Sequence, residues 1–322
     1  MTAPSHEDEG GTAIRIPRTG RKRVVVLINP VASSVTSSLR HVLISALSSR
    51  FEVTTVMTDS KGHGTLLAAD AAAAGVDAVV AFGGDGTANE AANGLALTGT
   101  PLTCLPGGSA NVFCGVTGIP RNLPGAVRQL LSRADDWQTR LVDTGNVNGR
   151  RFLFTSGAGL DAAVLAGVDA RPDLKRRWRQ WWFVTEAGRT IAKDYRFIPP
   201  KLRLEGDSSS AGVAVVVQNG RPWTYFGQRP VTVAKSAGLE TGSLTATVVA
   251  QPRPWDYPTL AWRAFSGIGA EGHPRLNLHT EPGFTVHPVD SDLIDVHVDG
   301  DHIGRFAEAS YSIDPGALCV LA

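Results

Sequence analysis

Two short glycine-rich segments carry the residue types that could hold a phosphate group. Gly83-Gly84-Asp85-Gly86-Thr87 follows one apolar run, and Pro106-Gly107-Gly108-Ser109-Ala110-Asn111 follows another. Glycine lets the backbone come close to a ligand, and the free N–H groups at the start of a helix attract anions. The first segment is not a P-loop, because no Lys-Ser/Thr follows it, and its spacing does not give GxGxxG. Both segments still predict phosphate binding through backbone N–H groups.

The first segment also has a purely structural interpretation. Thr87 and Glu90, three residues apart, fit a capping box, and the paired glycines could form only a tight turn. Ser109 suggests a hydrolase nucleophile, but the nucleophile-elbow motif requires glycine where Asn111 stands. A third apolar run ends in Asn29-Pro30-Val31-Ala32-Ser33. Three such ends in one parallel sheet would line a crevice suited to a nucleotide.

Near the C-terminus, Asp299 and Asp301 flank Gly300. Carboxylates can accept a proton or help to hold Mg²⁺. The preceding residues 294–298 alternate between apolar and polar, as in a half-buried strand. Asp299-Gly300 therefore also fits a type I′ hairpin turn without catalytic meaning.

The elements that position these residues alternate in the first part of the chain. Strands are expected at 24–30, 51–57, 77–82 and 101–105, and helices at about 36–49, 63–75 and 87–97 and after 106. This alternation predicts a doubly wound parallel sheet, in which ligands bind at the carboxyl ends of the strands.

Strand-like runs dominate from about residue 144 onward. An Asn-Gly pair between two such runs predicts a hairpin near 140–156. Further strands are expected at 212–219, 229–235, 243–250, 293–300 and 316–322, and helices near 173–194 and 255–268. The expected fold is therefore α/β, with a Rossmann-like doubly wound N-terminal domain and a mostly antiparallel second domain.

Several segments, taken in order, resemble the lipid kinase family that includes bacterial diacylglycerol kinases and sphingosine kinases. They are Asn29-Pro30, GGDGTANEAANGL (83–95), PGGSANVF followed by GVTGIP (106–120), SGAGLDA (156–162) and VDGD (298–301). The resemblance implies a Rossmann-like ATP-binding domain, a β-sandwich-like domain and an active site in the cleft between them. It also implies Mg²⁺-dependent transfer of the γ-phosphate of ATP to a hydroxyl of a diacylglycerol-like or long-chain-base lipid, a step of phospholipid biosynthesis.

With this resemblance, four segments are expected along the chain. They are a disordered tail at 1–23, a nucleotide-binding α/β domain at 24–143, a β-rich lipid-substrate domain at 144–308 and a final strand at 309–322 that could return to the first domain.

The resemblance also implies roles for individual residues. The catalytic base is expected at Asp301, where the family has Glu, with Asp299 beside it. Asp85 is the competing base, and we expect it to organise Mg²⁺–ATP instead. Contacts with ATP are expected at Asn29, Pro30, Ser33, Thr58, Gly83, Gly84, Asp85, Gly86, Thr87, Asn89, Glu90, Gly108, Ser109 and Asn111.

Composition and charge restrict the partners. The 31 Lys and Arg residues against 30 Asp and Glu argue against a dedicated nucleic-acid-binding protein. Three widely spaced cysteines and a first segment without an apolar run favour a cytoplasmic protein. Five basic residues and three Trp in the segment Arg171–Trp182 fit peripheral contact with an anionic membrane, although a packed helix with a basic face fits equally.

Two other functions stay open from the sequence. The GGDGT segment is shared with NAD kinases, so an NAD kinase-like enzyme is one alternative. The other is a nucleotide-binding protein that has lost catalysis, in which Asp301 is only a turn residue.

Overall fold

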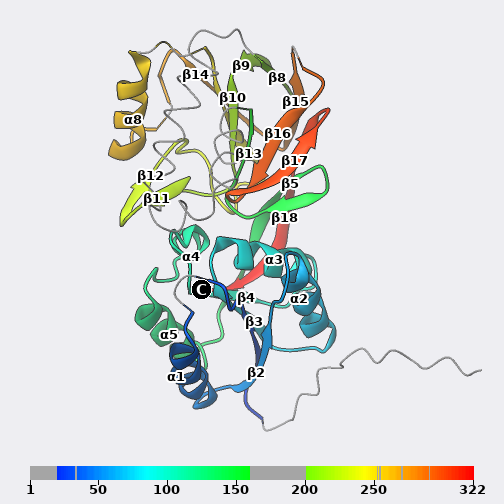
Figure 1. Ribbon diagram of the computed structural model, residues 1–322, viewed down its shortest axis with the longest axis vertical. Coiled ribbons are helices and arrows are strands. Elements are labelled where there is room, and N and C mark those ends of the chain that lie inside the picture. The colour runs from blue at the N-terminus through cyan, green and yellow to red at the C-terminus, as the bar shows by residue number, and fades with distance from the viewer. Residues whose placement is uncertain are drawn as a thin grey trace, which may run out of the picture.

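The computed structural model describes residues 20–32, 35–159, 201–251, 253, 255–269, 271–289 and 291–322. The molecule is elongated and has two lobes (Figure 1). The first lobe runs from β1 to α5 and includes the C-terminal end of β18, and the second lobe contains β6 to β17.

The first lobe is built on parallel strands in the order β2-β1-β3-β4. Their residues are mostly β-branched or aromatic, and those of β1, β3 and β4 are almost all buried, as expected for strands covered on both faces. The strands are β1 (Arg23–Ile28), β2 (Glu52–Met57), β3 (Ala78–Gly83) and β4 (Leu102–Pro106).

Helices connect and cover these strands. The first begins after Thr36, whose hydroxyl accepts the Leu39 N–H at 3.3 Å. The last begins after Asn122, whose side chain accepts the Gly125 N–H at 2.9 Å. The helices are α1 (Ser37–Ser48), α2 (His63–Ala73), α3 (Asp85–Leu95), α4 (Val112–Thr117) and α5 (Leu123–Ser132).

The second lobe consists of two sheets that face each other across a buried core. One is a six-stranded antiparallel sheet in the order β14-β13-β10-β7-β16-β17. The other contains β6, β15, β8 and β9 with parts of β5 and β18, and a short β11–β12 hairpin and helix α8 (Asp256–Ser266) lie outside both. The strands are β5 (Thr139–Val147), β6 (Arg150–Phe152), β7 (Thr155–Gly159), β8 (Leu202–Glu205), β9 (Ser209–Gly212), β10 (Ala214–Gln218), β11 (Thr224–Phe226), β12 (Arg229–Val231), β13 (Leu244–Val249), β14 (Leu276–Glu281), β15 (Gly283–Pro288), β16 (Ile294–Val298), β17 (Asp301–Phe306) and β18 (Ala309–Leu321).

Two long strands, β5 and β18, connect the lobes as an antiparallel pair (Figure 1). Tyr311 of β18 pairs with Val147 in the second lobe, and Leu321 pairs with Thr139 in the first. Val320 also pairs with Leu102 of β4 in parallel, so a single sheet of ten strands extends through both lobes. This shared sheet fixes the lobes relative to each other more firmly than a linker would.

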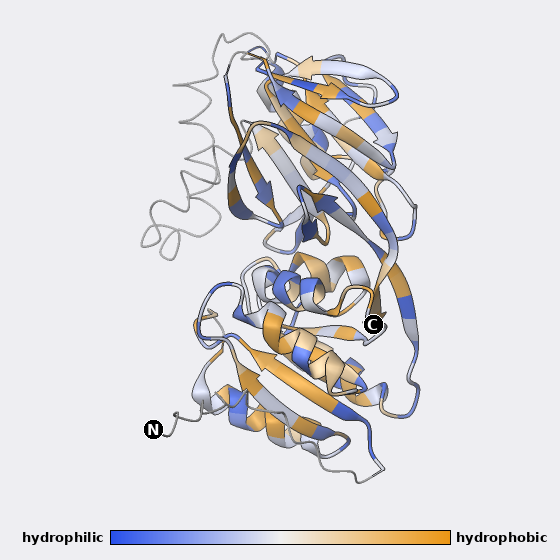
Figure 2. Ribbon diagram, turned by 90° about the vertical axis from the view of Figure 1, so that its right-hand side faces the viewer, coloured by the Kyte–Doolittle hydropathy of each residue, from blue (hydrophilic) through white to orange (hydrophobic). Residues whose placement is uncertain are grey.

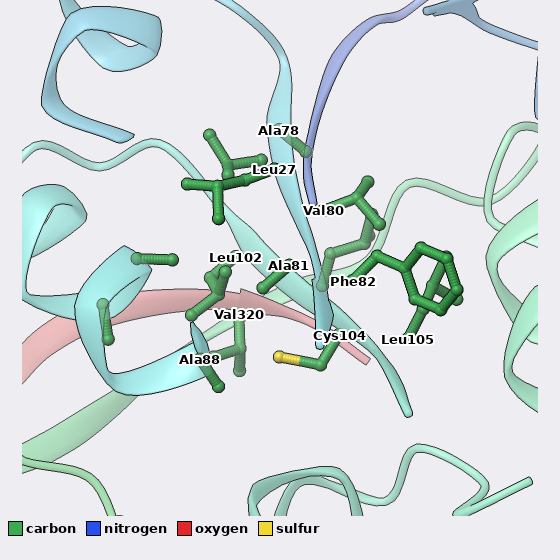
Figure 3. Close-up of a cluster of buried hydrophobic side chains, with 14 of the residues drawn as sticks. Leu27, Ala78, Val80, Ala81, Phe82, Ala88, Leu102, Cys104, Leu105 and Val320 are labelled. Carbon is green, nitrogen blue, oxygen red and sulfur yellow. The ribbon is translucent and has the colours of Figure 1, made fainter. Parts of the chain in front are cut away.

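Each lobe has its own core. The first is centred on the parallel strands and includes Leu27, Phe82, Leu102 and Val320 (Figure 3). The second lies between the two sheets of the second lobe and includes Val217, Leu244 and Phe284. Apolar residues lie along the strands of the first-lobe sheet, while the loops at the lobe surfaces are more polar (Figure 2).

The expected fold class is confirmed: a parallel α/β sheet is followed by antiparallel sheets that form a sandwich. The Asn-Gly hairpin is also confirmed, because Asn148 and Gly149 have φ of 49° and 85°, the positive values of a type I′ turn. Helix α5 and several short strands were not anticipated from the sequence. The helix expected near 173–194 lies outside the described residues.

Candidate active site

Three strand ends lie side by side at one edge of the parallel sheet. β1, β3 and β4 are neighbours, and each ends at this edge in a loop of small polar residues. The Asn29 N–H donates to the carbonyl of Phe82 at 3.1 Å, and the Gly107 N–H donates to the carbonyl of Gly83 at 2.7 Å. The structure therefore brings together the three segments from which a nucleotide site was predicted.

The two glycine-rich loops touch through their backbones. A Cβ atom on Gly108 would lie 2.7 Å from Gly84 Cα, which is closer than real Cβ contacts. Asn111 holds this geometry, because its Oδ1 accepts the Gly108 N–H at 2.9 Å and its Nδ2 donates to the Gly108 carbonyl at 3.0 Å. Glycine at position 108 thus permits an approach of the two backbones that a side chain there would prevent.

Gly86 occupies a different position, in the first turn of α3. Its backbone is helical, and a Cβ there would lie 3.5 Å from Asp301 Oδ2 of β17, at ordinary contact distance. Glycine at this position is therefore not required for folding. It leaves open the space between the N-terminal turn of α3 and the Asp301 carboxylate.

Gly86→Ala and Gly108→Ala should consequently have different effects on stability and activity. Gly86→Ala should keep or slightly raise the thermal unfolding temperature, because alanine favours a helix by about 1 kcal/mol over glycine. If the space beside Asp301 holds the reacting groups, Gly86→Ala should still lower catalytic turnover by about a hundredfold, because a methyl group enters that space. Gly108→Ala should lower stability by about 2 kcal/mol, because its methyl group meets backbone. Calorimetric unfolding and activity assays on both variants check this, and equal loss of stability would contradict it.

Asp85 connects the two loops from within the protein. Its Oδ1 accepts the N–H of Phe113, in the first turn of α4, at 2.9 Å. Burial raises the pKa of Asp85, and the N–H groups of Phe113, Val112 and Asn111 oppose that rise. The carboxylate therefore serves at least in part to cap α4 and to hold it against α3.

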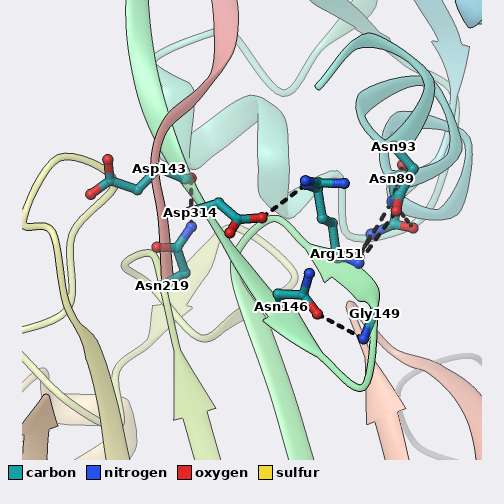
Figure 4. Close-up of polar contacts among 8 residues, drawn as sticks. All are labelled: Asn89, Asn93, Asp143, Asn146, Gly149, Arg151, Asn219 and Asp314. Atoms are coloured by element: carbon teal, nitrogen blue, oxygen red, sulfur yellow. Dashed lines mark hydrogen bonds and ion pairs between the residues drawn. The ribbon is translucent and has the colours of Figure 1, made fainter. Parts of the chain in front are cut away.

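Asn89 and Asp299 form a buried link between the lobes. Asn89 Nδ2 donates to Asp299 Oδ2 at 2.7 Å and to the Arg151 carbonyl at 3.0 Å. Asn89 Oδ1 accepts from Arg150 Nη2 at 2.7 Å and from Asn93 Nδ2 at 3.1 Å. Figure 4 shows Asn89 and Asn93 facing Arg151, whose side chain pairs with Asp314 of β18 at 3.0 Å. Both the nitrogen and the oxygen of the Asn89 side-chain amide thus have hydrogen-bond partners within the protein.

Asp299 accepts three backbone hydrogen bonds in addition to that of Asn89. Its Oδ2 accepts the Leu153 N–H at 2.7 Å, and its Oδ1 accepts those of Phe154 and Thr155 at 3.0 and 3.1 Å. Asp299 has φ of 48° and Gly300 has φ of 87°, so the pair forms the hairpin turn between β16 and β17. Asp299 is buried and directed away from solvent, and it positions the start of β17.

Titration of Asp299 should make stability depend on pH. Burial raises its pKa from 3.8 to about 6, against the lowering effect of its hydrogen bonds. Because the folded chain then binds this proton more readily than the unfolded chain, the part of the stability that depends on this proton is complete below about pH 4 and is lost as pH rises through about 6. Urea unfolding of the natural chain and Asp299→Asn between these pH values should show their stability difference falling as pH rises. A constant or rising difference would contradict the assignment.

Asp301 lies at the mouth of the cleft between the lobes. Its side chain is 46% exposed, and its Oδ2 lies 3.9 Å from Lys61 Nζ of the loop before α2. Both residues line a cavity of about 330 Å³ with Arg150, His302 and Phe306. Asp301 is therefore a carboxylate that a substrate can reach, beside the glycine-rich start of α3.

Thr87 and Glu90, two further predicted site residues, both have partners within the protein. Thr87 is buried, with its hydroxyl against Gly83 and accepting from Asn29 Nδ2 at 3.2 Å. The capping box is wrong: α3 begins after Gly84 without a side-chain cap, and the Glu90 carboxylate instead accepts the N–H groups of Gly62 and Gly64 at the start of α2.

Thr58, Pro30 and Ser109 lie at the ends of β2, β1 and β4. The Thr58 N–H donates to the Ile28 carbonyl at 3.0 Å. Pro30 and Ser109 are exposed, whereas Ser33 and the segment Arg171–Trp182 lie outside the described residues.

Sequence reasoning missed Lys61, Arg150 and Arg151 as residues of this region. Lys61 follows the second strand, where a basic residue near phosphates was a usable signal. The two arginines directly follow the Asn148-Gly149 turn, and nothing in their spacing indicates that they meet α3 from the other lobe.

The described residues contain no cluster of three or more His, Cys, Asp or Glu side chains that could hold a metal ion. Mg²⁺ in phosphoryl-transfer sites is commonly held by one or two carboxylates together with substrate phosphates. A single carboxylate beside the glycine-rich loops is compatible with that kind of site. Nor do those residues form a helix long and apolar enough to cross a bilayer.

Comparisons with known proteins agree with the arrangement. Residues 23–147 match the family described as "Diacylglycerol kinase catalytic domain". The chain is 31% identical over 283 residues to "Probable lipid kinase YegS-like" of Pseudomonas aeruginosa PAO1, covering 84% of each chain. It is 35% identical over 145 residues to the diacylglycerol kinase of Bacillus subtilis 168, covering 43% of this chain and 46% of that one.

A solved structure has the same fold. The crystal structure of a diacylglycerol kinase from Bacillus anthracis str. Sterne superposes with a TM-score of 0.67. The match covers 94% of this chain and 98% of that chain at 20% identity.

Proposed function

Because this chain belongs to the diacylglycerol kinase catalytic-domain family, we propose that it transfers the γ-phosphate of ATP to a hydroxyl group of a membrane lipid of diacylglycerol or long-chain-base type. One observation carries the proposal: an accessible carboxylate, Asp301, faces the first turn of α3 across the space that Gly86 leaves open. Phosphoryl transfer needs this combination of an anion-binding helix start and a nearby proton acceptor.

The nucleotide is proposed to bind along the loops after β1, β3 and β4. Backbone N–H groups near Gly84 and Gly108 would face its phosphates, because the glycines let the main chain approach closely. Asp85 is the carboxylate at this loop that would hold Mg²⁺, although its Oδ1 already accepts the Phe113 N–H. Bound Mg²⁺ supplies positive charge that offsets the negative charge of the phosphates.

Asp301 is proposed as the catalytic base. A lipid hydroxyl has a high pKa, so its proton moves to the carboxylate late, as the new O–P bond forms. The half-exposed position of Asp301 permits this contact, and Lys61 at 3.9 Å adds positive charge beside it. Asp299 has a different role: it accepts four hydrogen bonds and positions the turn from which Asp301 projects.

Incubation with γ-labelled ATP and an extracted lipid pool tests the function. Labelled lipid is the expected product, and its chromatographic identity names the substrate. Labelled NADP in a parallel reaction supplied with NAD would indicate the NAD kinase alternative. Nucleotide binding without any labelled product would indicate a chain that has lost catalysis.

A further inference from the structure

Helix α8 presents an apolar face to solvent, the reverse of the usual pattern for a surface helix. Trp255, Pro258, Ala261, Trp262 and Phe265 recur at a spacing of three to four residues, so they share one side of the helix. All five are exposed, and the residues Trp255 and Trp262 are 66% and 61% exposed. We call these five residues the aromatic face of α8. Residues on the other side, such as Leu260 and Ala264, are partly buried.

The protein holds α8 in place from behind. The Thr232 N–H donates to the Ala264 carbonyl at 2.9 Å, and Phe265 packs edge to face on Phe226 of β11 at 5.8 Å between ring centroids. Arg263 donates to the Gly269 carbonyl at 2.9 Å. The aromatic face is therefore presented by a helix that is anchored to the second lobe, next to the β11–β12 hairpin (Figure 1).

The charges around this face are arranged for an anionic partner. The Arg253 side chain is exposed, with its guanidinium 5.5 Å from the centre of the Trp255 ring, and Arg229 is exposed on β12. The neighbouring acidic residue Asp256 faces inward, where it accepts the Arg253 N–H at 2.8 Å and lies 3.6 Å from Arg275. A second acidic residue, Glu271, accepts the Lys235 N–H at 2.6 Å, so its carboxylate is also engaged within the protein.

The hairpin beside α8 reaches the first lobe near the glycine-rich loops. Tyr225 of β11 stacks on Arg121, whose Nη2 donates to the Gly227 carbonyl at 2.9 Å. The Tyr225 hydroxyl also packs against Gly115 of α4, the helix that Asp85 caps. A surface that engages α8 therefore lies on the same side of the molecule as the α4 end of the nucleotide loops.

We propose that the aromatic face of α8 docks on the surface of an anionic lipid bilayer, with Trp255 and Trp262 at the headgroup level and Arg253 and Arg229 against the lipid phosphates. Exposed Trp beside Arg suits this boundary, because indole rings settle at the interface and cations are attracted to anionic lipid. The choice of a bilayer over a protein partner rests on the proposed function, since a lipid kinase must meet its substrate in a membrane.

Vesicle sedimentation with the full chain, without nucleotide, tests the proposal. The chain should bind phosphatidylcholine vesicles containing phosphatidylglycerol more tightly than pure phosphatidylcholine, and added salt should weaken binding. The double variant Trp255→Ser/Trp262→Ser should bind at least about tenfold more weakly, because each Trp loses its burial in the interface. The control is Val42→Ser on α1, equally exposed at 68% and distant from α8, which should bind as the natural chain does.

Two further readouts make the outcomes distinct. Brominated lipid should quench part of the tryptophan fluorescence of the natural chain and less in the double variant. Activity on substrate dispersed in detergent should be equal in both, because neither Trp belongs to the active site. Failure of the kinase assay alone would contradict the proposed function and leave the docking test intact. Absence of vesicle binding, equal binding by the double variant, or self-association that the double variant abolishes would overturn the docking proposal.

Discussion

Asp301→Asn is expected to abolish phosphoryl transfer while ATP still binds. The amide has nearly the shape of the carboxylate but cannot accept the hydroxyl proton, and a general base contributes about 10²–10⁴-fold to a rate. Asp301 is half-exposed, and its carboxylate faces Lys61 at the surface rather than a buried donor. Its replacement should therefore leave the fold intact. Turnover and ATP affinity measured on the same preparation check both parts.

Asp301→Glu is the matched variant for this experiment. The family resemblance of the sequence implies Glu at the corresponding position, so a carboxylate one methylene longer should restore measurable turnover. Full activity of Asp301→Asn would remove Asp301 from the mechanism. Loss of ATP binding in the same variant would instead assign it to the nucleotide site.

Asp299→Ala is expected to destabilise the protein by about 3–5 kcal/mol, because it leaves four buried N–H donors without their acceptor. Asp299→Asn should cost less, about 2–3 kcal/mol, since the remaining amide oxygen still accepts while its NH₂ group faces another donor. Urea denaturation at pH 7 measures both. The loss of activity should follow the loss of folded protein, in contrast to Asp301→Asn.

Asn93→Ala is a suitable control for Asp299. Asn93 also lies at the lobe interface, where it donates to the Arg151 carbonyl at 3.3 Å. It is not among the hydrogen-bond donors to Asp299. Its replacement should cost about 1 kcal/mol. Equal stability of the natural chain and Asp299→Ala would contradict the view that Asp299 holds the two lobes in register.

Much of the fold could be predicted because several of its strands are marked by apolar runs in the sequence. β1 and β3 are continuous apolar runs that end in Asn or Gly, and the positive φ at Asn148 and Gly149 follows from an Asn-Gly pair. Helix α5 carries a usable signal as well, Asn122 before Leu-Pro, which is typical of a capped helix start. β7 was missed because its sequence, TSGAG, is short and rich in glycine, and it becomes a strand through pairing with β10 and β16.

The candidate site was predictable only in part for a related reason. The glycine-rich loops are local in sequence, so their contact follows from the order of parallel strands. The bond between Asn89 and Asp299 joins residues 210 positions apart, and no local pattern indicates it. Glu90 has the spacing of a capping box, yet the proximity of α2 gives its carboxylate two other N–H partners. Long-range packing therefore decided which polar residues face the cleft.

The most direct measurement is transfer of γ-labelled phosphate from ATP to lipid by the natural chain and Asp301→Asn, compared at equal ATP occupancy. We predict labelled phospholipid with the natural chain and almost none with the variant, while both bind ATP alike. Equal amounts of labelled lipid from the two proteins would contradict the role of Asp301. Labelled inorganic phosphate, or labelled NADP when NAD is supplied, without labelled lipid from the natural chain would contradict the account of the cleft as a site of phosphoryl transfer to a lipid hydroxyl.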